Sequence, residues 1–206
     1  MNLSGPKQAP YRQKMRDDML AIANRIVAAE GLAALQARRI ALEAKCAVGT
    51  LYNVFGGLDY LIIEANACTL DGLGAELAQA NQIAATGTVA DRLLALALAY
   101  LGFANKNTRA WRAIFEHQMS PNSEVPDWYR QRQGTLFGLV EDILDRVDPN
   151  PAVRISNARA LFSAVHGIVA ISLDSKLGDF DYAEAERQVR FIVTTIAAGL
   201  AQPPRS

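Results

Sequence analysis

Apolar residues recur at steps of three and four along most of the chain, and no stretch sustains a strict alternation of apolar and polar residues. The first such stripe consists of Met15, Met19, Ile22 and Ile26, and it is followed by Gly31. A repeat of three to four residues places side chains on one face of an α-helix, whereas a half-buried β-strand alternates with a period of two. The pattern therefore predicts an all-α protein.

Turn-forming residues divide this pattern into separate helices. Gly56 and Gly57 break it near the front of the chain, and the Asp-Pro-Asn-Pro segment 148–151 breaks it again further on. Thr88 and Thr108 are expected to cap the helices that follow them, because a hydroxyl oxygen can accept a hydrogen bond from the first turn. We expect about nine helices, at approximately 11–30, 38–44, 48–54, 58–80, 89–104, 109–117, 127–147, 152–177 and 182–200.

The segment from Arg38 to Phe55 predicts two short helices around a tight turn at 45–47, which is the spacing of a helix-turn-helix. In the second helix Leu51 and Phe55 lie four residues apart on the inward face, so small and polar residues such as Thr50 point outward. Such a helix can enter the major groove of DNA. Its candidate DNA-binding residues are Val48, Gly49, Thr50, Tyr52 and Asn53. Taken by its spacing and charge alone, the segment would equally fit a packed corner of an all-helical protein.

Charge is balanced over the whole chain but not along it. The chain has 21 Lys or Arg and 21 Asp or Glu, so its formal net charge at pH 7 is zero, which excludes a protein that binds nucleic acid with its whole surface. Residues 1–52 contain eight Lys or Arg and four Asp or Glu, an excess of four positive charges, and residues 53–206 carry the opposite excess. This distribution favours a DNA-facing surface near the N-terminus.

The N-terminal part of the chain contains Gly31, the triplet Arg39-Ile40-Ala41 and the string Val48-Gly49-Thr50-Leu51-Tyr52-Asn53-Val54-Phe55. In these residues it resembles the TetR family of bacterial transcriptional regulators, and in particular its AcrR-like members. The pattern Gly-Thr-Leu-Tyr-x-x-Phe at the start of the recognition helix is among the more specific helix-turn-helix signatures. The match extends from Met15 to Glu64.

The resemblance implies two domains behind a flexible N-terminal arm, 1–10. Residues 11–57 would form a three-helix helix-turn-helix domain, and residues 58–206 a larger helical domain that binds an effector and forms a homodimer. The implied function is a ligand-responsive regulator, usually a repressor released from a palindromic operator by a small molecule. Its partners would be double-stranded DNA, that effector and a second copy of the chain. The alternative is a helical small-molecule-binding dimer that no longer binds DNA specifically.

The segment departs from the family pattern at five positions. Lys45 replaces the usual Gly of the turn, Ala47 a Ser-like cap, Gln36 a Ser or Thr, Val54 a frequent His, and Leu58 a frequent Lys. Each missing cap would cost about 0.5–2 kcal/mol. The changes at Val54 and Leu58 remove family phosphate contacts, which positive charge near the turn is expected to replace. The candidate DNA-binding set is therefore completed by Gln36, Arg38, Arg39, Lys45 and Ala47.

The last two predicted helices offer a dimer interface. A symmetric dimer suits two half-sites one DNA turn apart, roughly 34 Å. The candidate interface residues are Leu161, Val165, Ile168, Leu173, Val189, Ile192, Val193 and Ile196. An intrachain core would explain some of them equally well. The string 164–170, which contains His166 and Gly167, resembles the His-Gly element of one C-terminal subgroup of the family, and the string 111–115 is compatible with it.

Aromatic side chains are concentrated in the middle of the chain. A small-molecule site is typically an apolar cavity with a few polar groups, so we expect a hydrophobic or aromatic effector. The candidate effector-binding residues are Tyr100, Phe103, Trp111, Phe115, His117, Trp128, Tyr129, Phe137 and His166. For each of these residues, ordinary core packing is the alternative.

No pattern in the sequence indicates an enzyme, a cofactor or a metal site. The two histidines lack Glu-x-x-His spacing, and no phosphate-binding glycine loop precedes a helix. Cys46 and Cys68 are too few for a disulfide framework or a metal-ligand set, and we expect both to be reduced. The longest apolar run, 93–104, is about half of the roughly 20 residues that span a bilayer. The N-terminus shows no signal-peptide pattern, so a cytoplasmic protein without a membrane partner is expected.

Overall fold

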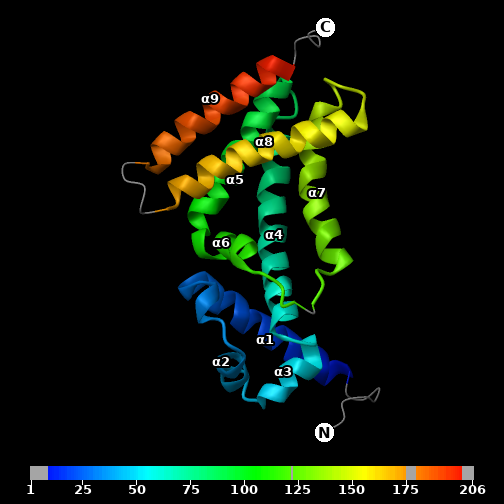
Figure 1. Cartoon of the computed structure of the whole chain (residues 1–206), viewed down its shortest axis with the longest axis vertical. Coiled ribbons are helices and arrows are strands. Elements are labelled where there is room, and N and C mark those ends of the chain that lie inside the picture. Colours follow the sequence, from blue (N-terminus) through cyan, green and yellow to red (C-terminus); the bar gives the residue numbers. More distant parts are fainter. Residues whose placement is uncertain (1–8, 122, 175–179, 201–206) are drawn as a thin grey trace. The chain divides into compact units, whose positions relative to one another are not determined.

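The computed structural model describes residues 9–121, 123–174 and 180–200 of the 206-residue chain. Within these ranges the chain forms nine α-helices, one short 3₁₀ helix and no β-strand (Figure 1), which confirms the all-α prediction. The helices are α1 (Ala9–Glu30), α2 (Ala37–Glu43), α3 (Val48–Phe55), α4 (Leu58–Ile83), α5 (Val89–Lys106), α6 (Thr108–Glu116), α7 (Asp127–Leu144), α8 (Pro151–Ser172) and α9 (Tyr182–Leu200), with the 3₁₀ helix η1 (Leu32–Ala34) after α1.

Most helix boundaries lie within two residues of the predicted ones, but α4 ends at Ile83 instead of 80, α7 at Leu144 instead of 147 and α8 at Ser172 instead of 177. Helix α1 begins at Ala9, so it includes the end of the predicted arm, of which residues 1–8 lie outside the described residues. Helix α6 begins at Thr108 and has Asn107 at its N-cap position, so the predicted Thr108 cap is wrong. Helix α8 ends at Ser172, whose hydroxyl donates to the carbonyl of Val169 (2.8 Å) in competition with the backbone. The predicted continuation to 177 falls partly on residues 175–179, which are outside the described residues.

Thr88 caps α5 as predicted. Its hydroxyl oxygen accepts a hydrogen bond from the backbone N–H of Asp91 (3.2 Å), and the carboxylate of Asp91 accepts one from the backbone N–H of Thr88 (2.9 Å). These reciprocal bonds form a capping box. The hydroxyl of Thr88, followed by its backbone N–H, lowers the pKa of Asp91 because both donors stabilise the charged carboxylate.

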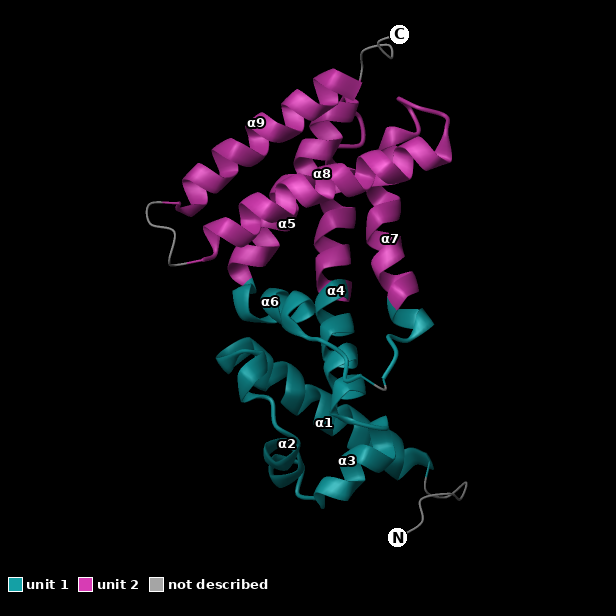
Figure 2. Cartoon of the chain, viewed as in Figure 1, with its two compact units in different colours: residues 1–70, 107–129 teal, residues 71–106, 130–206 magenta. Residues whose placement is uncertain are grey.

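The chain folds as two compact units, which are coloured separately in Figure 2. Unit 1 comprises the described parts of 1–70 and 107–129, and unit 2 those of 71–106 and 130–206. The predicted domains instead divide the chain between residues 57 and 58. The difference arises because unit 1 takes in the first half of α4 and all of α6.

Two hydrogen bonds explain why these segments belong to unit 1. The buried side chain of Asn66 in α4 donates to the carbonyl of Ala113 in α6 (3.1 Å). Arg109, also in α6, donates to the carbonyl of Ala29 near the end of α1 (2.6 Å). Helices α1, α4 and α6 are therefore connected within one unit, although α6 is distant in sequence from the other two.

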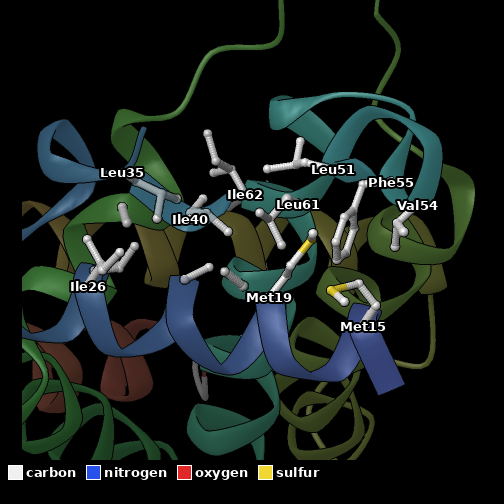
Figure 3. Packing of buried hydrophobic residues seen from close by; sticks show 14 residues of the cluster. Met15, Met19, Ile26, Leu35, Ile40, Leu51, Val54, Phe55, Leu61 and Ile62 are labelled. Carbon is white, nitrogen blue, oxygen red and sulfur yellow. The ribbon is translucent and has the colours of Figure 1, made fainter. Parts of the chain in front are cut away.

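The apolar core of unit 1 forms where α1 meets α3 and the start of α4. Figure 3 shows Met15 of α1 beside Phe55 of α3, and Met19 of α1 beside Leu61 of α4. Met19, Leu51 and Leu61 have no exposed surface. Full burial of one such side chain stabilises a fold by about 1.5–3 kcal/mol. The stripe that predicted the first helix is thus the surface on which the helix-turn-helix is assembled.

The turn between α2 and α3 begins with a left-handed residue, Lys45 (φ 54°). The N–H of Lys45 donates to the carbonyl of Leu42 (3.2 Å), and the N–H of Cys46 donates to the carbonyl of Ala41 (2.9 Å). This pair of bonds is the Schellman motif, in which glycine is usual because it has no Cβ. The turn therefore keeps the geometry of a glycine turn with lysine in its place, at a cost of about 1–2 kcal/mol.

Helices α5, α8 and α9 pack together in unit 2. Leu101 of α5, Val169 of α8 and Val193 of α9 have no exposed surface. Helix α9 begins and ends at the predicted residues, 182 and 200. These three helices supply the core of unit 2 together with α7, whose Ile143 also has no exposed surface.

Helix α8 is the one described helix that is long and apolar enough to cross a membrane, judged by length and composition alone. A core helix of a helical domain passes the same test. Helix α8 contacts α5 and α9 and buries Leu161, Val165 and Val169. Part of its apolar surface is therefore used in packing within unit 2.

Replacing Lys45 with glycine is expected to raise the free energy of unfolding by about 1 kcal/mol, because glycine adopts a positive φ without a steric penalty. Lys45→Ala is the matched control, since alanine loses the same charge but keeps the Cβ. Urea unfolding of both variants measures the difference. Equal stability of the two variants would contradict a strained backbone at this position.

Candidate nucleic-acid interface

The recognition helix α3 has one buried face and one exposed face. Leu51, Val54 and Phe55 are buried in unit 1. Thr50 is half-buried, and the other predicted outward residues are exposed: Val48, Gly49, Tyr52 and Asn53. Val54 points into the core, so this position presents no group to a ligand. The arrangement leaves an outer face of small and polar side chains.

Helices α2 and α3 both begin without a side-chain cap. Gln36 precedes α2 and Ala47 precedes α3, and neither makes a side-chain hydrogen bond to the first turn. Both helix starts therefore lack the side-chain cap that the sequence already indicated was missing. Both side chains are exposed, so these positions remain accessible at the ends of the two helices.

Arg39 is held by carboxylates of its own unit. Its two terminal nitrogens donate to the two oxygens of Glu30 (2.8 and 2.6 Å), and its Nε donates to Glu43 (3.2 Å). Glu43 also forms an ion pair with Arg25 of α1. The hydrogen bonds that Arg39 donates to Glu30 and Glu43 raise the pKa of Arg39, which is charged at any physiological pH. The charge of Arg39 therefore links α2 to α1.

Arg38 and Lys45 have different surroundings from Arg39. Both side chains are exposed, and neither forms an ion pair with any residue in the described part of the chain. They lie on α2 and on the turn that leads into α3. Of the three cations predicted to replace lost phosphate contacts, these two keep their charge available at the surface.

Two arginines that the sequence analysis did not single out lie at the C-terminal end of α3. Arg12 donates to the carbonyl of Asn53 (3.1 Å), and Arg16 donates to the carbonyl of Val54 (3.0 Å). Both belong to α1, where their spacing of four places them on one face. That spacing is a detectable signal, but the carbonyls they meet are 41 and 38 residues away in sequence and follow only from the fold.

Arg16 also connects α3 to α4. It forms an ion pair with Glu64 of α4, and its guanidinium carbon lies 4.7 Å from the centre of the Phe55 ring. Burial raises the pKa of Glu64 more than Arg16 lowers it. The side chain of Arg16 thus contacts the end of the recognition helix, an aromatic ring of the core and the next helix.

His117, a predicted effector residue, is buried at the end of α6 in unit 1. Its side chain is 7% exposed, and no described residue forms a hydrogen bond with its Nε2. Asp59 Oδ1 lies 3.6 Å from that nitrogen, and the other oxygen of Asp59 accepts from the backbone N–H of Ser120 (3.1 Å). Burial lowers the pKa of His117, and Asp59 opposes that shift only in part. The imidazole is therefore favoured in its neutral form.

Four more predicted effector residues form two aromatic pairs in unit 1. The ring centres of Trp111 and Phe115 are 5.0 Å apart, and those of Trp128 and Tyr129 are 5.8 Å apart. Trp111 and Tyr129 are buried, whereas Phe115 and Trp128 are exposed. Burial raises the pKa of Tyr129 to about 12.

The other predicted effector residues lie in unit 2, where three of them surround Phe162. The Phe162 ring lies 5.9 Å from Tyr100, 5.1 Å from Phe137 and 5.2 Å from His166, on which it stacks. The Tyr100 hydroxyl and His166 Nδ1 are hydrogen-bonded at 2.8 Å, and burial lowers the pKa of His166. Phe103 is buried on the same helix as Tyr100. We call Tyr100, Phe137, Phe162 and His166 the Phe162 cluster.

Sequence analysis missed Phe162, although a signal for it exists. Phe162 precedes His166 by four residues on α8, so the two side chains lie on one face of the helix. Its contact with Tyr100 of α5 and Phe137 of α7 depends on how three helices of unit 2 pack.

The predicted interface residues divide into two groups. Leu161, Val165, Val189 and Val193 are buried inside unit 2, and the last two have no exposed surface to offer a partner. The other four are partly exposed: Ile168, Leu173, Ile192 and Ile196. The packing of α5 and α8 on α9 explains this division, because the inward side of each helix is already covered. Ile171 is exposed by 44%, and Phe191, which was not predicted, is exposed by 70%.

Metal-ligating residues are not gathered in the part of the chain that the structure describes, where no group of three or more His, Cys, Asp or Glu could hold an ion. Cys46 is partly buried and Cys68 is exposed, and both are free thiols. The candidate interface therefore rests on the helix-turn-helix and on its charges.

Solved structures of other proteins share the fold of this chain. The fold is similar to that of a protein of unknown function from Rhodococcus sp. RHA1, with 21% identity, coverage of 91% of this chain and 96% of that one, and a TM-score of 0.72. It is similar to a TetR-family transcriptional regulator from Streptomyces coelicolor (20% identity, 92% and 97% coverage, TM-score 0.67). It is also similar to the multidrug binding protein EbrR in complex with imidazole (23% identity, 93% and 97% coverage, TM-score 0.62).

Sequence comparison identifies the family. No curated protein sequence matches the chain. Residues 93–196, which are just over half of the 206-residue chain, match a family model described as a tetracycline repressor-like C-terminal domain. The AcrR-like and His-Gly subgroups stay predictions. With a helix-turn-helix in unit 1 and this match in the helical remainder, the chain belongs to the TetR family of transcriptional regulators.

Proposed function

We propose that the protein is a repressor that binds a palindromic operator as a dimer and leaves it when a small hydrophobic or aromatic molecule binds. The observation that carries the DNA-binding part is the outer face of α3, where small and polar side chains are exposed while Leu51 and Phe55 anchor the inner face. The family assignment supports a ligand-responsive DNA-binding regulator and a regulatory rather than catalytic role. A cytoplasmic location belongs to this proposal, since operator DNA lies there.

In the proposed complex, α3 enters the major groove. Thr50 and Asn53 can contact base edges, and Val48 can pack on a thymine methyl group. Phosphate contacts come from the exposed Arg38 and Lys45, whose charges are not paired with any described carboxylate. Gln36 and Ala47 lie at the helix starts, and Arg39 supports α2 through Glu30.

Arg38→Gln is expected to reduce the slope of log affinity against log salt by about one, because one phosphate contact is lost. Arg39→Gln is the matched control, and it should lower the melting temperature while leaving the slope unchanged. Fluorescence anisotropy with a labelled duplex from upstream of the protein's own gene measures both slopes. If the folded wild-type protein fails to bind this duplex at low salt, the proposed DNA binding is overturned.

The dimer is proposed to form through the outer surfaces of α8 and α9. Exposed Ile171 and Phe191 lie on these helices together with the partly exposed Ile168, Ile192 and Ile196. An apolar surface of this kind favours association with a second copy, because burying it removes apolar area from water. Two copies related by a two-fold axis would present two recognition helices to two half-sites.

Phe191→Asp is expected to weaken the dimer at least about tenfold, because a charge replaces an aromatic side chain at the interface. Ile83→Asp is the control, since Ile83 is exposed by 78% compared with 70% for Phe191 but lies at the end of α4. Sedimentation equilibrium measures the dissociation constant of each variant. A monomeric wild-type protein at micromolar concentration, or an equal effect of both substitutions, would argue against this interface.

The effector is proposed to pack in unit 2 against the Phe162 cluster. Phe137, Phe162 and His166 are partly exposed there, so an aromatic ligand can reach their rings. The hydrogen-bonded Tyr100 and His166 add a polar pair to an otherwise apolar surrounding, which is the usual composition of a small-molecule site. The effector binds more tightly to the form of the dimer that does not fit the operator. The ratio of its affinities for the two forms sets how far DNA affinity falls.

Phe162→Leu is expected to raise the ligand concentration needed for half-maximal release of DNA by about two- to tenfold, because an aromatic contact is lost. Phe115→Leu, which changes a ring in unit 1, is the control and should leave that concentration unchanged. The measurement is anisotropy of the labelled duplex during titration with a panel of small aromatic compounds. A larger effect of Phe115→Leu, or no release by any compound, would count against the Phe162 cluster as the effector site.

A helical small-molecule-binding dimer without specific DNA binding is the second candidate. The two missing helix caps and the engagement of Arg39 by Glu30 favour it, because they weaken the helix starts and reduce the positive charge available to DNA. Binding of the upstream duplex no tighter than a scrambled duplex would support this candidate over the repressor.

A further inference from the structure

The recognition helix carries no positive charge of its own. No Lys or Arg occurs between Lys45 and Arg92, so α3 and α4 contain none. Lys45 lies in the turn that leads into the N-terminal end of α3, and Arg38 lies at the start of α2. At its C-terminal end the last carbonyls point along the helix axis and carry partial negative charge, which disfavours the approach of a phosphate group.

Two arginines of α1 cover this C-terminal end. The guanidinium of Arg12 bonds the carbonyl of Asn53 (3.1 Å), and that of Arg16 bonds the carbonyl of Val54 (3.0 Å). A cation at the end of a helix offsets the negative pole of the helix dipole. The two side chains therefore offset the negative pole at the end of α3.

The charge of Arg16 is compensated within the protein. Its ion pair with Glu64 and its position over the Phe55 ring place it partly inside unit 1, with 35% of the side chain exposed. A guanidinium engaged in this way holds α3 against α4. Arg16 is therefore a positioning residue.

The charge of Arg12 is not compensated in this way. The side chain is exposed and forms no ion pair with any carboxylate among residues 9–121, 123–174 and 180–200. A guanidinium has five N–H donors, and the bond to Asn53 uses one of them. The remaining donors can form the bidentate bonds that suit a phosphate group.

We propose that Arg12 is a phosphate-contacting residue of the DNA interface, held beside the recognition helix by the carbonyl of Asn53. The inference rests on the proposed DNA binding and adds a contact from α1 at the opposite end of α3 from Lys45. Asn53 is itself exposed on the outer face of α3, so the cation bonded to its carbonyl lies next to that face. Because phosphate groups are the same in every sequence, this contact strengthens specific and non-specific binding alike.

The test compares Arg12→Gln with Lys14→Gln, each of which removes one positive charge from the exposed start of α1. Lys14 bonds Asp18 on its own helix (2.6 Å) and makes no described bond to α3. Binding is measured between 50 and 200 mM salt on the upstream duplex and on a scrambled duplex of equal length. Arg12→Lys, which keeps the charge, is measured in parallel.

Arg12→Gln is expected to reduce the slope of log affinity against log salt by about one on both duplexes. When salt rises from 50 to 200 mM, the variant should therefore lose about three- to fourfold less affinity than the wild type. Lys14→Gln should leave both slopes unchanged, and Arg12→Lys should keep most of the wild-type slope. An unchanged slope for Arg12→Gln overturns the inference. A loss confined to the upstream duplex also overturns it, because it would assign Arg12 to positioning of α3.

The same measurements separate this inference from the proposed function. A wild-type protein that binds neither duplex overturns DNA binding itself, and the contact of Arg12 with it. A wild-type protein that binds the upstream duplex while Arg12→Gln retains its slope leaves the proposed function intact and removes only the contact.

Discussion

Burial of the inner face of α3 is the constraint on which the rest of unit 1 depends. An isolated helix of eight residues is unstable in water, because nucleation costs more than so few hydrogen bonds return. Leu51, Val54 and Phe55 bring the helix into the core formed by α1 and α4. Tertiary packing therefore stabilises α3, and the absence of a side-chain cap at Ala47 is tolerated for the same reason.

The charges of unit 1 are divided between internal and external tasks. Arg39 bonds Glu30 and Glu43, and Arg16 pairs with Glu64. These bonds join neighbouring helices and remove positive charge from the surface. The pairs of Arg39 are already counted in the excess of four positive charges in residues 1–52, whereas Glu64 lies outside that range, so its pair with Arg16 lowers the positive charge that a DNA backbone would meet.

Aromatic residues that are close in sequence belong to different structural units. Trp111 and Trp128 belong to unit 1, whereas Tyr100 and Phe137 belong to unit 2. The aromatic residues that are concentrated in the middle of the sequence therefore lie in two separate environments, one in each unit. Within unit 2, Tyr100 and His166 form a hydrogen-bonded polar pair in the Phe162 cluster. The spacing of residues along α8 does not predict this pair, because Tyr100 lies on α5.

The sequence by itself determined the helical class, most helix boundaries and the two faces of α3. These features depend on spacings of a few residues, such as the stripe from Met15 to Ile26 and the four-residue step from Leu51 to Phe55. The Thr88 cap could be predicted for the same reason, since its partner Asp91 is three residues away.

Tertiary structure alone decided which charges are paired, which apolar residues remain exposed and where one unit ends. Arg12 meets a carbonyl 41 residues away, and Tyr100 meets a histidine 66 residues away. Val189 and Phe191 lie two positions apart on α9, yet one is fully buried and the other is exposed by 70%. Local patterns show that a residue is charged or apolar, but its partner is set by helices that meet only after the chain has folded.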